Sequence, residues 1–142
     1  DRVRAGHPGP LVFVGKSMGG RVGCHLANEL GENGPTALVC LGYPLVGQKG
    51  AMRDAVLLDL LTPILFVQGT RDSLCPSDRL AAVRASMSVK NELHLVEGGD
   101  HSLRVSARGL AARGSTQADV DEEVMRRIEE FIASILERSP DI

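Results

Sequence analysis

The stretch Leu11-Val12-Phe13-Val14-Gly15-Lys16-Ser17-Met18-Gly19-Gly20 decides how the chain folds. Four apolar residues run directly into Gly-x-Ser-x-Gly, and an amphipathic segment over 18–30 follows at once. This order predicts a strand, a sharp turn and a helix, with Ser17 in a strained backbone conformation at the turn. Gly15 and Gly19 are expected where a side chain would collide with the neighbouring strand or helix. The N–H groups at the start of the helix, near Met18, would face whatever Ser17 attacks.

Composition and charge narrow the class of protein. The chain has 142 residues, 43% of them hydrophobic, and a net charge of −2 at pH 7. This length supports one domain over 1–142, and the weak net charge gives no reason to expect nucleic acid or an anionic membrane as a direct partner. No apolar run approaches the roughly 20 residues of a membrane span. The three cysteines lack metal-ligand spacing, which favours buried free thiols and an intracellular location, cytoplasmic or nuclear.

Apolar runs alternate with amphipathic segments along the whole chain, which predicts an α/β fold. We expect a three-layer arrangement in which a parallel sheet of about four strands has helices on both faces. Strands are predicted over 11–14, 36–41, 64–68 and 92–96. Helices are predicted over 18–30, over 55–61, from Ser77 onward, and over a long apolar stripe from Val120 to Leu136 that Thr116 or Ser115 would cap.

Two further local predictions concern helical and loop surfaces. In the helix over 18–30, Val22, Leu26 and Leu30 share one helical face, with Ala27 beside them. The segment 104–114 contains three arginines and is expected to be an irregular basic loop. Arg104, Arg108 and Arg113 are interpreted as solvated residues, although they could also bind an anionic substrate.

Reactive side chains follow three of the predicted strands. Ser17, Asp72 and His101 occur in that order, and the carboxyl ends of parallel strands meet at one edge of a sheet. Ser17 is the candidate nucleophile, His101 the base that removes its proton, and Asp72 the acid that fixes the imidazole tautomer. Asp100 is a rival acid, but a residue adjacent to His101 in the chain is badly placed to reach its ring. The backbone N–H of Met18 is the candidate oxyanion-hole donor.

Other candidate sites have simpler interpretations. His7, His25 and His94 are interpreted as packed or surface histidines. Gly15-Lys16-Ser17 also looks like the end of a phosphate-binding loop, but that motif needs a glycine five residues before Gly15, where Pro10 stands. A nucleotide-binding site would also require the apolar residues over 11–14 to form the loop.

Four motifs together resemble one branch of the α/β-hydrolases. They are Gly15-Lys16-Ser17-Met18-Gly19-Gly20-Arg21, Gly42-Tyr43-Pro44-Leu45, Gln68-Gly69-Thr70-Arg71-Asp72 and Gly99-Asp100-His101-Ser102. The branch is the dienelactone-hydrolase-like group that contains testis-expressed protein and subunit 3 of the NSL chromatin complex. The resemblance implies Ser17, Asp72 and His101 as a catalytic triad, with no metal or organic cofactor. It also implies that the segment 43–53 lies over the site.

The same resemblance implies that the chain corresponds to the C-terminal half of such a fold. A complete core would have about eight strands with the serine turn near the middle. We therefore expect a hydrolase of esters, thioesters or amides that is weak or inactive as this chain alone. The strand over 11–14 would leave an apolar edge open to self-association. The alternative is a non-catalytic scaffold whose partner is a protein, as in a chromatin-type complex, rather than a small acyl substrate.

Overall fold

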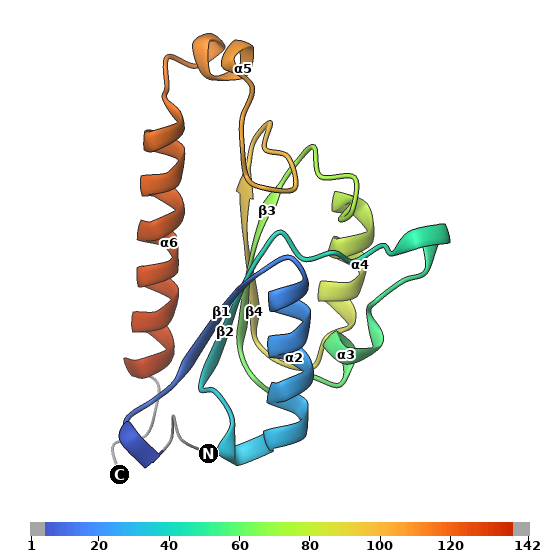
Figure 1. Cartoon of the computed structure of the whole chain (residues 1–142), viewed down its shortest axis with the longest axis vertical. Helices are drawn as coiled ribbons and strands as arrows, with labels where there is room; N and C mark the ends of the chain where they lie inside the picture. The colour runs from blue at the N-terminus through green and yellow to red at the C-terminus, as the bar shows by residue number, and fades with distance from the viewer. Residues whose placement is uncertain (1–4, 138–142) are drawn as a thin grey trace.

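A four-stranded parallel sheet forms the centre of the molecule (Figure 1). The computed structural model describes residues 5–137. The strands lie in chain order across the sheet: β1 (Val12–Lys16), β2 (Ala37–Leu41), β3 (Ile64–Gly69) and β4 (Asn91–Val96). All three pairings are parallel, and Val39 of β2 pairs with both Val14 and Leu65. The predicted fold class is confirmed, and the carboxyl ends of the four strands point to one end of the sheet.

Helices cover both faces of the sheet. Figure 1 shows α6 alone on one side, with α2, α3 and α4 on the other and α5 beyond the carboxyl end of β4. The helices are α2 (Met18–Leu30), α3 (Ala55–Leu58), α4 (Ser77–Ser86), α5 (Ala107–Ala112) and α6 (Gln117–Glu137), with short 3₁₀ turns η1 (Gly31–Asn33) and η2 (Gln48–Gly50). No helix within residues 5–137 is long and apolar enough to cross a membrane.

The two central strands, β2 and β3, are buried on both faces, and their alternate residues enter two separate cores. Ile64 and Phe66 of β3 pack with α2, α3 and α4, whereas Leu65 and Val67 pack under α6. The predicted apolar stripe of α6 supplies much of the second core, where each fully buried side chain contributes about 1.5–3 kcal/mol. Its buried residues are Val120, Val124, Ile128, Phe131 and Ile135.

Thr116 caps α6 as predicted. Its amide donates to Asp119 Oδ2 at 2.9 Å, and its hydroxyl oxygen accepts from the Asp119 amide at 3.1 Å. This reciprocal pair satisfies two of the amides that a helix N-terminus leaves without partners. The backbone hydrogen bond from Thr116 also lowers the pKa of Asp119 below its ordinary value.

Of the residues on the predicted helical face of α2, Ala27 is buried, but the larger side chains are not. Val22 and Leu26 are 49% and 39% exposed, and the face that meets the sheet consists of small residues, Gly20, Gly23, Cys24 and Ala27. The reason is the place of β1, which among the described residues pairs only with β2 and so forms an edge of the sheet. The apolar row on the outer side of α2 therefore borders a groove of about 400 Å³ beside β1.

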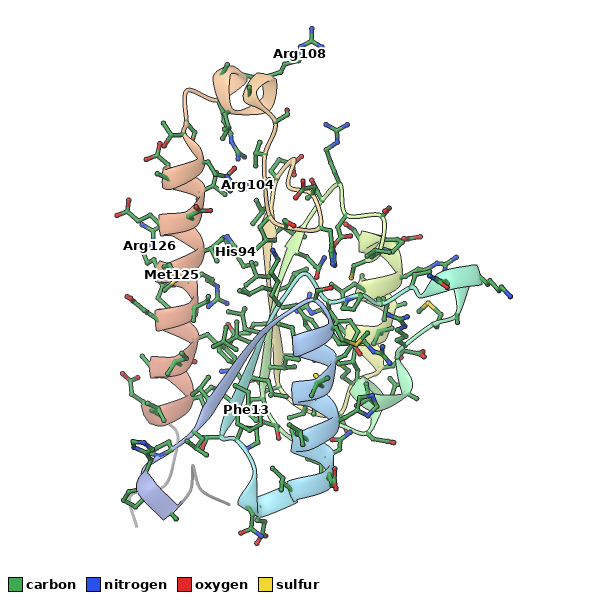
Figure 2. The ribbon with its side chains drawn as sticks, viewed as in Figure 1. Phe13, His94, Arg104, Arg108, Met125 and Arg126 are labelled. Carbon is green, nitrogen blue, oxygen red and sulfur yellow. The ribbon has the colours of Figure 1, made fainter. Side chains whose placement is uncertain are left out.

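The prediction of an irregular loop over 104–114 is also wrong in part, because residues 107–112 form α5. The Ser106 hydroxyl accepts a hydrogen bond from the Gly109 amide at 3.1 Å and so caps this short helix. Figure 2 shows Arg108 projecting from α5 away from the rest of the molecule. The cysteines, Cys24, Cys40 and Cys75, are buried free thiols as expected.

Candidate functional site

Ser17 occupies the sharp turn between β1 and α2. Its φ of 52° and ψ of −120° are unusual for a residue with a side chain, as predicted for this position. The Ser17 amide donates to the Leu41 carbonyl at 2.9 Å, which anchors the turn to the end of β2. The strain therefore lies at a residue that its neighbours hold in place.

The glycines of the turn differ in their roles. A Cβ atom at Gly15 would overlap the backbone of Gly19 and Gly20, so the turn can close only with glycine there. The same prediction for Gly19 is wrong, because a Cβ atom there would meet nothing within 4 Å. Gly20 is the second position where a side chain would meet its neighbours, since a Cβ atom there would lie 3.0 Å from Cys40 Sγ.

Three side chains from three strand ends form one chain of hydrogen bonds. Ser17 Oγ lies 2.8 Å from His101 Nε2, and His101 Nδ1 lies 2.8 Å from Asp72 Oδ2. Ser17 follows β1, Asp72 follows β3, and His101 lies in the turn after β4. The structure thus brings together the three residues singled out from the sequence. In this arrangement Asp72 accepts from Nδ1–H, which leaves Nε2 free to accept the Ser17 proton.

Burial differs sharply along this chain of hydrogen bonds. The Asp72 side chain is 0% exposed, whereas the His101 side chain is 29% exposed. A shielded carboxylate interacts more strongly with its partners than one in water, because water does not screen it. The imidazole and the serine hydroxyl remain within reach of a molecule that approaches from solvent.

Asp100, the rival acid, has a different task. Its Oδ1 accepts from the amides of Ser102 and Arg104 at 2.8 and 3.0 Å, which closes the turn that carries His101. The hydrogen bond from the Arg104 amide is the main reason that the pKa of Asp100 lies below its ordinary value. Asp100 is therefore a turn residue, and Asp72 is the carboxylate that contacts the imidazole.

Gln68 is a site residue that the sequence interpretation did not single out. It lies in β3 and is 1% exposed, and its Nε2 donates to Asp72 Oδ2 at 3.0 Å. Its Oε1 accepts from the Tyr43 amide at 2.6 Å. The available signal was a polar residue at the end of an apolar strand, since a buried amide must find hydrogen-bond partners.

Comparison with known proteins places the chain in a family. Residues 1–133 match a family model described as an alpha/beta hydrolase domain. The chain belongs to this α/β-hydrolase family. Because β1 is a strand over Val12–Lys16, the residues that a phosphate-binding loop would need are already in the sheet.

Solved structures of α/β-hydrolases share the fold at low sequence identity. A Klebsiella pneumoniae protein provisionally assigned as a dienelactone hydrolase has a TM-score of 0.66 and 24% identity, over 93% of this chain and 56% of its own. Est1E from Butyrivibrio proteoclasticus has a TM-score of 0.63 and 15% identity, over 92% and 63%. An alpha-beta serine hydrolase homologue from Coxiella burnetii has a TM-score of 0.58 and 20% identity, over 71% and 46%. The chain thus spans about half the length of the solved structures it matches.

Two further predictions concern the oxyanion-hole donor and the segment 43–53. Met18 is the first residue of α2, so its amide has no acceptor within the helix and is free to face a ligand. The segment 43–53 meets the site at Tyr43, whose amide donates to Gln68 Oε1 at 2.6 Å. Farther along, Met52 contacts Arg79 of α4, and η2 extends away from the strand ends (Figure 1).

The other histidines and the three arginines of the segment 104–114 do not join this site. His94 is half-buried between β4 and α6 (Figure 2), where burial lowers its pKa below the ordinary value. His7 and His25 are exposed. Arg113 donates to the Glu97 carbonyl at 3.1 Å, and Arg104 and Arg108 are exposed, which agrees with their interpretation as solvated residues.

Proposed function

We propose that the protein is a serine hydrolase that cleaves esters, thioesters or amides through an acyl-Ser17 intermediate. The observation that carries the proposal is the unbroken series of hydrogen bonds from Ser17 Oγ through His101 to Asp72, each 2.8 Å long. A serine hydroxyl is a weak nucleophile until a base removes its proton, and this arrangement provides that base. Ser17, His101 and Asp72 are the proposed catalytic residues.

The proposed reaction proceeds in two acyl transfers. Ser17 Oγ attacks the substrate carbonyl carbon while His101 Nε2 takes the hydroxyl proton, and the N–H of Met18 stabilises the resulting oxyanion. His101 then returns that proton to the leaving group as the acyl–leaving-group bond breaks. A water molecule, deprotonated by His101, then attacks the acyl-serine carbonyl. As the acyl–Ser17 bond breaks, His101 returns this proton to Ser17 Oγ, and the carboxylic acid is released. The steps balance with water as the only co-reactant, so the proposal includes no metal or organic cofactor.

Hydrolysis of a series of p-nitrophenyl esters and acyl thioesters tests this proposal. The protein should be expressed with any coding sequence that precedes Asp1, beside the S17A, D72N and D100N variants. We expect S17A to lose all turnover above background and D72N to fall by about 10³–10⁴ in kcat, since the amide would hold the wrong imidazole tautomer. D100N keeps the oxygen that closes the turn and should retain activity. Activity that survives in S17A, or equal losses in D72N and D100N, would contradict the mechanism.

The alternative function is a non-catalytic scaffold that binds a protein partner. It rests on the four motifs, which we propose place the chain in the dienelactone-hydrolase-like branch with testis-expressed protein and subunit 3 of the NSL chromatin complex. Under this alternative, an S17A variant would support every cellular role of the protein. A cellular defect in S17A, with unchanged protein level, would exclude it.

We also propose that the edge of β1 pairs with a second copy of the chain. Val14 is 54% exposed, and the groove beside β1 is lined in part by Val12, Phe13, Val22 and Leu26. An open apolar strand edge offers both backbone hydrogen-bond groups and apolar surface to another strand.

A further inference from the structure

The carboxylate of Asp72 depends on three donors, of which only one is the imidazole. Oδ2 accepts from His101 Nδ1 at 2.8 Å and from Gln68 Nε2 at 3.0 Å, and Oδ1 accepts from the Leu74 amide at 2.9 Å. The side chain of Asp72 is fully shielded from solvent, so water cannot replace a missing donor. A buried charge is tolerated only when hydrogen bonds satisfy it, and hydrogen bonds to a carboxylate are among the stronger ones.

The orientation of the Gln68 amide is determined by its second partner. Its Oε1 lies 2.6 Å from the Tyr43 backbone nitrogen, and a backbone N–H can only donate. The oxygen of the amide must therefore face Tyr43, which directs the NH₂ group at Asp72. Tyr43 is itself held, because its hydroxyl donates to the Arg53 carbonyl at 2.8 Å and its ring packs edge-on against Phe66.

Gln68 consequently joins two parts of the site that are distant in the sequence. It lies near the end of β3, four residues before Asp72, and its partner Tyr43 follows β2. Gly42, next to Tyr43, lies so close to His101 that a Cβ atom built on it would meet the backbone and the imidazole of that residue. The amide thus connects the segment behind the imidazole to the carboxylate that orients it.

We propose that Gln68 is a positioning residue that fixes the Asp72 carboxylate, and through it the imidazole of His101, in the geometry for proton transfer from Ser17. This inference rests on the proposed hydrolase function. Gln68 touches neither the proposed nucleophile nor a substrate, and it acts only by holding Asp72 Oδ2 on the line to His101 Nδ1. The Leu74 amide retains the other carboxylate oxygen, so loss of Gln68 would loosen the acid rather than release it.

The Q68M and Q68E variants test the proposal. Methionine has a similar length but offers no N–H, and glutamate keeps an acceptor while placing a second negative charge beside Asp72. We expect the rate of Ser17 labelling by a fluorophosphonate probe to fall on the order of tenfold in Q68M and further in Q68E. The downfield proton NMR signal of His101 Nδ1–H, which reports its bond to Asp72, should shift or broaden in both variants.

The Q117M variant is the matched control. Gln117 is also a bridging amide, since its Oε1 accepts from the Val105 amide at 3.0 Å and its Nε2 donates to the Leu103 carbonyl at 3.1 Å. It contacts no part of Asp72, so Q117M should lose thermal stability but keep both the labelling rate and the NMR signal. All rates are measured well below each variant's unfolding temperature, which separates positioning from a loss of folded protein.

The outcomes separate this inference from the proposed function. If the probe labels Ser17 in the wild-type protein, and Q68M shows the same labelling rate and the same NMR signal, then only the proposed role of Gln68 is overturned. A wild-type protein that shows the Nδ1–H signal but no labelling would overturn the hydrolase proposal. In that case the shift of the signal in Q68M and Q68E would still decide whether Gln68 positions Asp72.

Discussion

Replacing Gly42 with alanine would place a methyl group against the proposed catalytic base. Gly42 has a φ of +67°, and a Cβ atom built there would lie 2.5 Å from the His101 carbonyl oxygen and 3.5 Å from His101 Nδ1. Ordinary contact begins near 3.4 Å, so the His101 backbone must retreat from 2.5 to 3.4 Å, a displacement of about 0.9 Å. A misplacement of this size at a catalytic group costs roughly 10²-fold in rate.

Gly50 provides the matched control for this substitution. Its φ is +76°, but a Cβ atom there would meet nothing within 4 Å. G42A and G50A therefore share the cost of placing alanine in the left-handed region, about 1–2 kcal/mol, and differ in the contact with His101. The comparison isolates the displacement of the imidazole from the general strain of the substitution.

The assay is the second-order rate of Ser17 labelling by a fluorophosphonate, together with thermal unfolding of each variant. We expect both variants to be less stable than wild type, and only G42A to lose about 10²-fold in labelling rate. Equal labelling rates in folded G42A and G50A would contradict this prediction, because they would show that His101 tolerates the displacement or does not activate Ser17.

Three further predictions concern the turn, the sheet edge and a buried thiol. G15A should lose about 1–3 kcal/mol of unfolding free energy and most Ser17 labelling, because its methyl group overlaps the backbone of the turn. G19A should be neutral or more stable by up to about 1 kcal/mol, because its methyl group meets nothing within 4 Å. Chemical denaturation measures both variants, and equal losses of unfolding free energy would contradict the difference between the two glycines. Sedimentation velocity of the 142-residue chain should show association that increases with concentration. The V14K variant should stay monomeric, since lysine on a strand edge opposes pairing. A wild-type chain that stays monomeric would contradict the proposed pairing through β1. Burial raises the pKa of the Cys75 thiol from 9.0 to about 12, and the charge of Asp72 adds to this rise. The unfolded chain therefore loses the thiol proton at lower pH than the folded chain does, so the unfolding free energy should fall as pH rises from 9 towards 12. The fall should be less steep in C75A. Urea titrations at several pH values measure it, and the same dependence of unfolding free energy on pH in both proteins would contradict this prediction.

The periodicity of apolar residues predicted most of the fold. The rule that the carboxyl ends of parallel strands meet at one edge of a sheet predicted that Ser17, Asp72 and His101 lie close together. The apolar residues within 36–41 and 64–68 were sufficient because strands buried on both faces are apolar at nearly every position. Since all the strands are parallel, residues that follow them share one end of the sheet, and this rule holds whatever the exact strand bounds.

The errors have physical causes that a single sequence does not contain. Periodicity gave Val22 and Leu26 a common face, but it could not show that β1 is an edge with nothing over that face in the described residues. Likewise, the difference between Gly19 and Gly20 depends on the path of the helix past Cys40. The role of Gln68 depends on a contact with Tyr43, which only the pairing of β2 with β3 creates.

Covalent modification by a fluorophosphonate shows directly whether Ser17 is an activated nucleophile. The folded protein, expressed with any coding sequence that precedes Asp1, is treated with the probe, digested and mapped by mass spectrometry, beside the S17A and H101A variants. We expect one adduct, on Ser17, that is absent from S17A and formed far more slowly in H101A. A folded wild-type protein without an adduct on Ser17, or labelling that does not depend on His101, would contradict the proposed function.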